Sequence, residues 1–224
     1  DEFLSIASHE LKTPLTSVKA YLQLIELSLG NVENEIKLFA QKAIISVDRL
    51  QSLISELLDV SKIQQQKLNL NIVSFDFDEM LIRVIESGEF NSKVHKIIKA
   101  GDEVKEIRAD KERIEQVINN ILNNAMKYSP DGGDIIVEVS RVKEDLMVTV
   151  TDQGIGISTY NLEKIFERYF RAEGHDIHFQ GLGIGLFISM EIIKMHGGKM
   201  WATSKIGHGS IFSFMIPMHN DSIN

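Results

Sequence analysis

The sequence predicts an α+β fold with an N-terminal helical hairpin that forms a dimeric four-helix bundle, followed by an α/β sandwich domain. Two observations predict this. Residues 1–68 carry apolar side chains at alternating intervals of three and four, whereas residues 72–219 mix short β-rich runs with helical patterns. The length of 224 residues suits one large domain or two small ones. We therefore place the domain boundary between positions 68 and 72.

Two apolar seams define the helical hairpin, with Gly30-Asn31 as the predicted turn between them. The first seam comprises Leu4, Ser8, Leu11, Leu15, Val18, Leu22, Ile25 and Leu29. The second comprises Ala43, Val47, Leu50, Ile54, Leu57 and Ser61. One antiparallel hairpin would leave too much of this surface in water, so two copies are expected to pair as a homodimer.

The second domain combines six β-rich runs with three helical patterns. The runs are Lys96–Ala100, Ile107–Ala109, Ile135–Val142, Leu146–Thr151, Lys199–Ser204 and Ser210–Ile216. The helical patterns are Asp76–Ser87, Asp110–Tyr128 and Gly185–His196. The third and fourth runs alternate in polarity across a short turn and predict a hairpin. We expect an antiparallel-rich sheet with helices on one face, and we assign Trp201, Phe212 and Phe214 to the core.

The composition excludes several classes of function. The chain has no cysteine, which rules out disulfides, thiolate metal sites and thiol catalysis. Its formal net charge is −8 and no run of Lys and Arg forms a basic patch, so no nucleic-acid partner is expected. No apolar run approaches the ~18 residues that span a membrane. Because the chain opens at Asp1 within a helical pattern, we interpret it as part of a longer protein.

A histidine with an acidic neighbour lies in the first helix, in the stretch SHELKTPLT. His9 is one step past the seam position Ser8, so its ring lies on the flank of the bundle. One interpretation is a solvated surface histidine. The other is a nucleophile, since imidazole is largely neutral near pH 7 and Glu10 could take its ring proton. Thr13, four residues on, shares the face of His9 and could orient a water.

The stretch Asp110–Tyr128 is an amphipathic helix with an unusual number of asparagines. Asn120 and Asn124 share a face, and Lys127 and Tyr128 end the helix. Asparagine is a mediocre helix former, so its presence needs a reason. One possible reason is capping or surface polarity. The other is ligand binding, in which the side-chain carbonyl of Asn124 ligates Mg²⁺ and Lys127 contacts a phosphate.

Two glycine-bearing loops follow predicted strands. DQGIGIS places Asp152 at a strand end, where it can accept a hydrogen bond from an exocyclic amine, and Gly154 and Gly156 allow close approach of a flat ligand. Such a loop alone is weak evidence. GLGIGL then leads into a helix, and a glycine-rich helix N-terminus is suited to an anion. Its glycine spacing differs from that of dinucleotide-binding motifs.

Three other features receive brief interpretations. The polar segment Ala172–Gln180 is a candidate lid over a ligand. His175 and His178 within it have no third ligand nearby, which disfavours a metal site. His196 precedes Gly197-Gly198 and is expected to cap a helix C-terminus.

Taken together, SHELKTPLT, NNILNNAMKYS, DQGIGIS, IFERYFR and GLGIGL resemble, in this order, the H, N, first glycine, F and second glycine boxes of sensor histidine kinases of two-component systems. The resemblance covers nearly the whole chain. It implies a dimerisation and histidine phosphotransfer hairpin over residues 1–68 and a catalytic, Bergerat-type ATP-binding domain over residues 72–219, with ATP and Mg²⁺ as ligands.

The resemblance also implies roles for individual residues. His9 is similar to the phosphoacceptor, Glu10 to the base, and Glu10 with Thr13 to a phosphatase motif. Residues that resemble the family's nucleotide contacts are Asn120, Asn124 (the Mg²⁺ ligand), Lys127, Tyr128, Asp152, Gly154, Gly156, Ile165, Arg171, Gly181, Leu182, Gly183, Gly185 and Leu186. Leu182 stands where many members carry a hydroxyl residue, which removes one hydrogen bond but leaves the backbone N–H groups.

The function implied is autophosphorylation of His9 by ATP and transfer of the phosphoryl group to an aspartate of a response-regulator receiver domain, with phosphatase activity in addition. The alternative is a nucleotide-gated interaction module that dimerises without phosphotransfer. Under the first interpretation, an upstream sensor region is absent from this chain, and the chain is the cytoplasmic part of a membrane-anchored protein.

Overall fold

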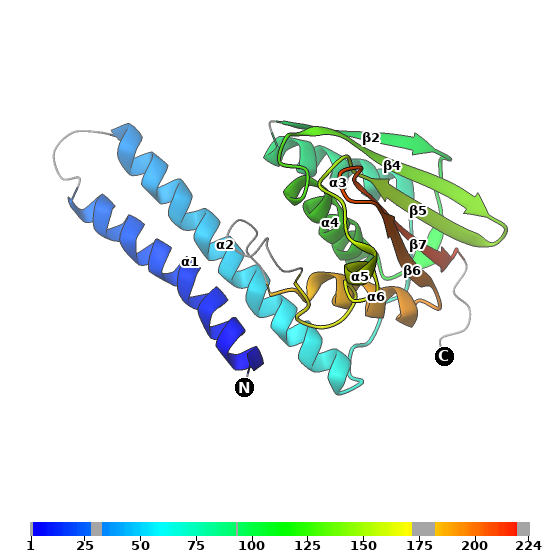
Figure 1. The fold of residues 1–224 in the computed structure, drawn as a ribbon, viewed down its shortest axis with the longest axis horizontal. Helices are drawn as coiled ribbons and strands as arrows, with labels where there is room; N and C mark the ends of the chain where they lie inside the picture. Colours follow the sequence, from blue (N-terminus) through cyan, green and yellow to red (C-terminus); the bar gives the residue numbers. More distant parts are fainter. Residues whose placement is uncertain (1, 28–32, 93, 172–181, 219–224) are drawn as a thin grey trace. The chain divides into compact units, whose positions relative to one another are not determined.

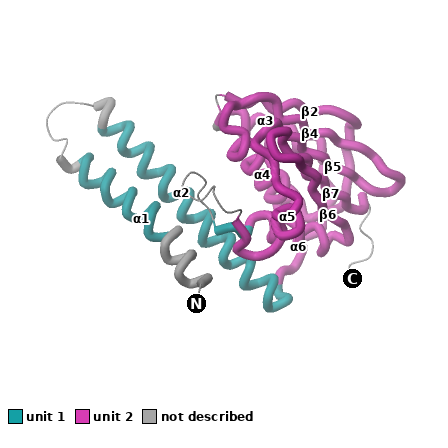
Figure 2. The backbone as a smooth tube through the Cα atoms, in the orientation of Figure 1, with its two compact units in different colours: residues 1–67, 173–184 teal, residues 68–172, 185–224 magenta. Residues whose placement is uncertain are grey.

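The computed structural model describes residues 2–27, 33–92, 94–171 and 182–218, without the side chains of residues 2–10, 26–27, 33–35 and 91 (Figure 1). The chain divides into two compact units (Figure 2). One comprises residues 1–67 with 173–184, and the other comprises residues 68–172 with 185–224. Helices dominate the first unit and a mixed sheet with helices makes up the second, so the predicted α+β class is confirmed.

The first unit contains two long helices, α1 (Glu2–Leu27) and α2 (Glu33–Gln64), which lie antiparallel (Figure 1). The rings of Tyr21 in α1 and Phe39 in α2 stack with centroids 6.4 Å apart, and the predicted turn at Gly30-Asn31 lies outside the described residues. α1 continues through Pro14. The hydroxyls of Thr16 and Ser17 donate to backbone carbonyls four residues earlier, at 2.8 and 3.1 Å.

Alternate positions of the predicted seams remain in water. Leu15, Leu22, Val47 and Ile54 are exposed, whereas Leu11, Val18, Ile25, Leu50 and Leu57 are partly buried and Ala43 is buried. The two helices also expose further apolar side chains: Leu24, Ile36, Leu38, Ile44, Ile45 and Leu58. Within the described residues, the hairpin buries only one side of each seam. This is the pattern expected of a hairpin that packs against a second copy.

A five-stranded sheet in the order β2-β4-β5-β7-β6 forms the centre of the second unit. Its strands are β2 (His95–Gly101), β4 (Gly133–Val142), β5 (Asp145–Thr151), β6 (Lys199–Ser204) and β7 (Ser210–Pro217). Every neighbouring pair is antiparallel except β2 and β4, which are parallel. A parallel pair requires a crossover, and the chain between these strands supplies it with helix α4 (Lys111–Lys127).

Helices α3 (Phe77–Asn91), α4 and α6 (Gly185–Met195) cover one face of this sheet (Figure 1). The strands alternate accordingly. In β5, Leu146, Val148 and Val150 are buried and the residues between them are half-buried. Asp76 and Asp110 accept hydrogen bonds from the third backbone N–H of α3 and α4, as N-cap residues do.

The structure adds elements that the sequence pattern did not predict and corrects one core residue. β1 (Val73–Phe75) pairs with β3 (Ile107–Ala109), and α5 (Thr159–Leu162) is a single turn. Phe212 and Phe214 are buried as predicted, but Trp201 is only half-buried. It pairs with Ser213 on the sheet face opposite the helices, and Lys199 Nζ lies 5.7 Å from its ring centroid.

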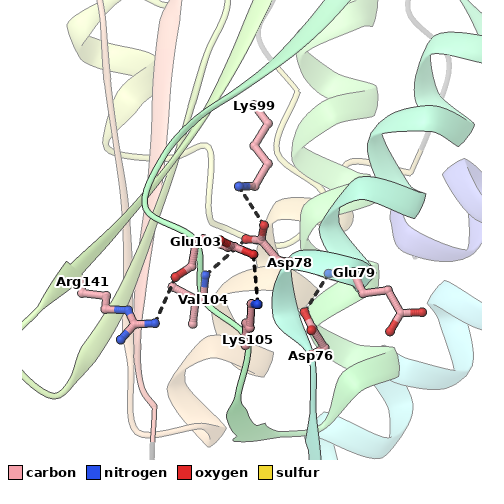
Figure 3. A network of polar contacts seen from close by, with 8 residues as sticks. All are labelled: Asp76, Asp78, Glu79, Lys99, Glu103, Val104, Lys105 and Arg141. Carbon is pink, nitrogen blue, oxygen red and sulfur yellow. Dashed lines mark hydrogen bonds and ion pairs between the residues drawn. The ribbon is translucent and has the colours of Figure 1, made fainter.

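A polar network holds the loop between β2 and β3 against the start of α3 (Figure 3). The buried Asp78 carboxylate accepts from the Val104 N–H at 3.3 Å and pairs with Lys99 Nζ at 3.0 Å. The Asp78 N–H donates in turn to the Val104 carbonyl at 3.0 Å. Arg141 of β4 donates to the Glu103 carbonyl at 3.0 Å, which attaches the same loop to the sheet.

We expect Asp78→Ala to lower the free energy of unfolding by about 1–3 kcal/mol, because the buried Val104 N–H and Lys99 would both lose their carboxylate partner. Glu79→Ala is the matched control. The Glu79 side chain is 65% exposed and pairs only at the surface with Arg83, so its loss is expected to change stability by less than about 0.5 kcal/mol. Urea unfolding at neutral pH checks both, and equal effects would contradict the role of the network.

His196 lies directly after α6 and is fully buried. Its Nδ1 donates to the carbonyl of Ile192 at 2.8 Å, so the predicted C-terminal cap is confirmed. Its Nε2 accepts from the Asp110 N–H at 3.0 Å, and these two partners require the neutral Nδ1–H tautomer. Burial lowers the pKa of His196, although the Ile192 carbonyl and the Asp110 charge act in the opposite direction.

Because the folded pKa of His196 lies below its unfolded value, its contribution to stability is complete above about pH 6.5. It is lost as the pH falls, since the unfolded chain then binds a proton that the folded chain excludes. We expect wild type to lose up to about 1.4 kcal/mol more per pH unit below 6.5 than His196→Gln, measured by urea unfolding from pH 8 to 5. Parallel pH profiles of the two proteins would show that the folded ring protonates normally.

Candidate nucleotide-binding site

One predicted site residue of the second unit, Asp152, is a buried carboxylate. Asp152, which directly follows β5, is 4% exposed. Its Oδ1 accepts from the Gly154 N–H at 2.8 Å and from the Ser210 N–H at 3.1 Å. Among the described residues no donor reaches Oδ2. One oxygen is therefore held by the backbone, and the other is left for a donor such as an exocyclic amine.

Burial raises the pKa of Asp152, and the two backbone hydrogen bonds oppose that shift. A carboxylate in this position is stabilised by a donor that approaches its second oxygen. The site therefore favours a ligand with an N–H group over one that offers only acceptors.

The loop after Asp152 leaves no room for side chains. A Cβ at Gly154 would collide with the Tyr128 carbonyl at the end of α4, and a Cβ at Gly156 would collide with the Lys205 carbonyl. Gly156 also has a φ of +71°, which side-chain-bearing residues rarely adopt. The Ile155 N–H donates to the Tyr128 carbonyl at 3.0 Å. The loop is thus packed between the end of α4 at Tyr128 and the backbone at Lys205.

Helices α4 and α6 meet at the asparagines. Asn120 Nδ2 donates to Ser189 Oγ at 2.9 Å, and a Cβ at Gly185 would collide with Asn120 Oδ1. Asn120 therefore positions the first turn of α6, a role that the sequence did not predict. Asn124, one turn further along α4, is half-buried, and no hydrogen bond of its side chain is formed within the described residues. Its amide oxygen is available to a ligand.

The remaining polar contacts lie near the ends of these helices. Lys127 is the last residue of α4, and its Nζ lies 5.0 Å from the Tyr128 ring centroid.

Gly185 begins α6, whose first backbone N–H groups have no helical partner. Gly183 has a φ of +68°, Leu182 is buried and Leu186 is half-buried. This helix start offers donors and a positive dipole end to an anion.

Two predicted site residues, Ile165 and Arg171, lie in the segment that follows α5. Ile165 and Arg171 are both half-buried, and the Ile165 N–H donates to the Asn161 carbonyl at 3.0 Å. The guanidinium of Arg168 lies 4.6 Å from the ring centroid of Phe187 in α6. Arg168 therefore packs on α6, a contact that the sequence analysis did not assign.

Several predicted residues lie outside the described part of the chain. These are Gly181, the candidate lid Ala172–Gln180 with His175 and His178, and the side chains of His9 and Glu10. The backbones of His9 and Glu10 are helical in α1, and Thr13 is half-buried on the same helix. Among the described residues, no group of three or more His, Asp or Glu side chains could hold a metal ion.

Sequence reasoning missed the turn between β6 and β7 as part of the site. Ser210 supplies an N–H to Asp152, and a Cβ at Gly209 would collide with the Asp152 carbonyl. The Gly207 N–H donates to the Ile155 carbonyl at 2.8 Å. The paired glycines of GHGS, residues 207–210, were the available signal.

Two family descriptions match the chain. Residues 109–220 match the histidine kinase-, DNA gyrase B- and HSP90-like ATPase family, and residues 1–66 match the histidine kinase A phosphoacceptor domain. The chain belongs to the sensor histidine kinases. The predicted family and its two-component type of catalytic core are confirmed, and the second unit carries the family's ATP-binding fold.

Individual kinases agree with this assignment. The chain is 31% identical to the sensor histidine kinase WalK of Bacillus subtilis, over 96% of this chain and 36% of that protein. It is 32% identical to the sensor protein kinase WalK of Staphylococcus aureus, over 96% of this chain and 53% of that one. The chain thus spans between about a third and a half of these relatives.

The structure of the Acinetobacter baumannii histidine kinase AdeS superposes with a TM-score of 0.71 at 25% identity. The match covers 94% of this chain and 98% of that one. Within the described residues of the kinase, no helix is both long and apolar enough to cross a membrane.

We expect Asp152→Asn to weaken ADP binding by tenfold or more, because the new amide N–H would face the donor that the free carboxylate oxygen accepts. Its thermal stability is expected to be equal to or above that of wild type, since a buried charge is removed while Oδ1 still accepts from the backbone. Calorimetric titration with ADP and thermal unfolding check the two halves. Asp145→Asn, at the start of the same strand, is the control; equal ADP affinities in both variants would contradict the assignment.

Proposed function

We propose that the chain is a protein histidine kinase core in which ATP phosphorylates His9 and the phosphoryl group then passes to an aspartate of a response-regulator receiver domain. The observation that carries the proposal is the half-satisfied carboxylate of Asp152 over the glycine loop, in a chain whose first 66 residues match a phosphoacceptor domain. We assign the phosphotransfer role to residues 1–68 and the nucleotide-binding role to residues 72–219.

Adenine fits the Asp152 end of the site. Its exocyclic amine is a donor of the kind that Oδ2 lacks among the described residues. Ile165 is proposed as an apolar wall for the ring, and Tyr128 lies against the loop after Asp152. These residues would bind and orient the base and take no part in the chemistry.

The phosphates are proposed to lie toward the start of α6. The free N–H groups at Gly185, with those of Gly181 to Gly183 and the backbone at Leu182 and Leu186, would donate to phosphate oxygens. Lys127 and Arg171 are proposed to offset phosphate charge, and Asn120 is proposed as a further nucleotide contact. The unbonded amide oxygen of Asn124 suits Mg²⁺, which needs few protein ligands and, when bound, would neutralise developing charge on the phosphates.

His9 is the proposed nucleophile and Glu10 the proposed base. The neutral ring attacks the γ-phosphorus with one nitrogen while Glu10 takes the proton of the other. A P–N bond forms and the bond from phosphorus to the β-γ bridging oxygen breaks, so ADP leaves with that oxygen. The chain's contribution is mainly positioning and electrostatic, as in other phosphoryl transfers.

Thr13 is proposed to serve the phosphatase reaction, in which water attacks the aspartyl phosphate of the regulator and releases aspartate and inorganic phosphate. It lies four residues after His9 on α1, hence on the same helical face, and it is half-buried. Its uncharged hydroxyl can orient a water, and Glu10 lies three residues before it in the sequence.

The proposed kinase is a homodimer through its helical hairpin. Leu15 and Leu22 of α1 and Val47 and Ile54 of α2 are exposed although they belong to the seams. Pairing two hairpins would remove these side chains from water, and each contributes roughly 1.5–3 kcal/mol when fully buried. This gain is the physical reason to expect a four-helix bundle.

Incubation with γ-labelled ATP and Mg²⁺ tests the proposal. We expect label in the intact chain, acid-labile and alkali-stable as a phosphoramidate is, and none in His9→Gln or Asn124→Ala. His9→Gln should still bind ADP with unchanged affinity, because His9 belongs to the phosphoacceptor region and not to the nucleotide site. An intact chain that binds ATP but takes no label would instead support a nucleotide-gated interaction module.

A further inference from the structure

Helices α4 and α6 lie antiparallel and are joined at two places. Toward the N-terminal end of α6, Asn120 in the middle of α4 donates to Ser189 and lies against Gly185. At the other end, Asp110 at the start of α4 donates its N–H to Nε2 of His196 just past α6. The nucleotide residues proposed above lie near the first end, and His196 lies near the second.

The hydrogen bond between Asp110 and His196 is buried away from water. His196 is 0% exposed and Asp110 is 6% exposed. A buried N–H without an acceptor costs about 1–3 kcal/mol, so the Asp110 N–H depends on the ring nitrogen that accepts from it. The ring is held by its own second bond, from Nδ1 to the Ile192 carbonyl one turn back.

Asp110 carries this link further, to the segment that follows α2. Its Oδ1 caps α4 by accepting from the Arg113 N–H at 3.1 Å, and its Oδ2 accepts from the Asn71 N–H at 2.8 Å. Asn71 lies seven residues after the end of α2 at Gln64, just beyond the buried Leu68. One aspartate thus joins the segment between the two domains to both nucleotide-bearing helices.

We propose that His196 is a positioning residue for the nucleotide site and that its bond with Asp110 couples nucleotide binding to the backbone of the connecting segment at Asn71. The inference rests on the proposed nucleotide site. The coupling would act along α4, in which Asp110 and Asn124 are separated by roughly 21 Å at 1.5 Å per residue. A ligand that clamps one end of a rigid helix pair reduces opening at the other end.

Three variants test separately the hydrogen bonds that His196 and Asp110 form. His196→Gln places an amide oxygen near the position of Nε2 and can still accept from the Asp110 N–H. His196→Asn places its amide near Nδ1 and keeps only the local bond to the Ile192 carbonyl. Asp110→Ser retains an N-cap oxygen for the Arg113 N–H but has no second oxygen for Asn71.

Hydrogen exchange of the Asn71 amide, followed by NMR in the whole chain with and without ADP and Mg²⁺, is the test. In wild type we expect saturating ADP to slow exchange about tenfold, within the usual range of coupling between two sites. His196→Gln should keep this protection, whereas His196→Asn and Asp110→Ser should lose most of it. Reciprocity requires ADP affinity to fall by a similar factor in those two variants.

A purely structural role predicts another outcome. His196→Asn would then melt at a lower temperature, but at 20 °C its ADP affinity and its ADP-dependent protection of Asn71 would equal those of wild type. That result, or a wild-type Asn71 amide that ignores bound ADP, would overturn the inference while leaving the kinase proposal intact. Failure of wild type to bind ADP at all would remove the proposed function itself and this inference with it.

Discussion

The burial of one carboxylate, that of Asp152, is the constraint on which the arrangement of the second unit's loops depends. A charged oxygen removed from water must be met by donors, and here the backbone supplies them from two directions, Gly154 on its own loop and Ser210 from the next hairpin. The second hairpin can approach only because Gly209 has no side chain to meet the Asp152 carbonyl. Further bonds lock the two loops, from Ile157 to Ser204 and from Gly207 to Ile155.

Glycines also allow close packing where a helix meets a loop or another helix. Gly154 lets the loop lie against the end of α4, and Gly185 lets α6 begin against Asn120. Each of these glycines is required by contact with a neighbour, so the apparent glycine-rich motif is a record of close approach between elements. Among the described residues no donor reaches Asp152 Oδ2, and the first N–H groups of α6 have no helical partner. These are the groups that we propose for the nucleotide.

The two units differ in how their apolar surface is satisfied. The second unit buries its strand residues under three helices, as the core residues Val148, Ile118 and Ile192 show. The hairpin instead leaves Leu15, Leu22 and Ile54 in water. A sheet with covering helices completes its own core, whereas a two-helix hairpin has too few layers to do so.

Periodicity and turn chemistry determined most elements from the sequence: Ile107–Ala109 and Lys199–Ser204 were predicted with the bounds that the structure shows, and Asp110 as the start of a helix is its N-cap. The short elements β1 and α5 were not predicted. The family also follows from sequence, because its motifs are local, while the roles of Asp152, Asn124 and His9 stay predictions.

Only the tertiary structure decided which groups satisfy one another across the chain. Ser210 and Asp152 are 58 residues apart, and His196 and Asp110 are 86 apart, yet each pair shares a hydrogen bond. No local pattern encodes such a pairing, because it depends on strand order and on helices that cross the same face of the sheet. The sequence therefore determined which side chains this member of the family carries, and the fold decided which of them bond to one another.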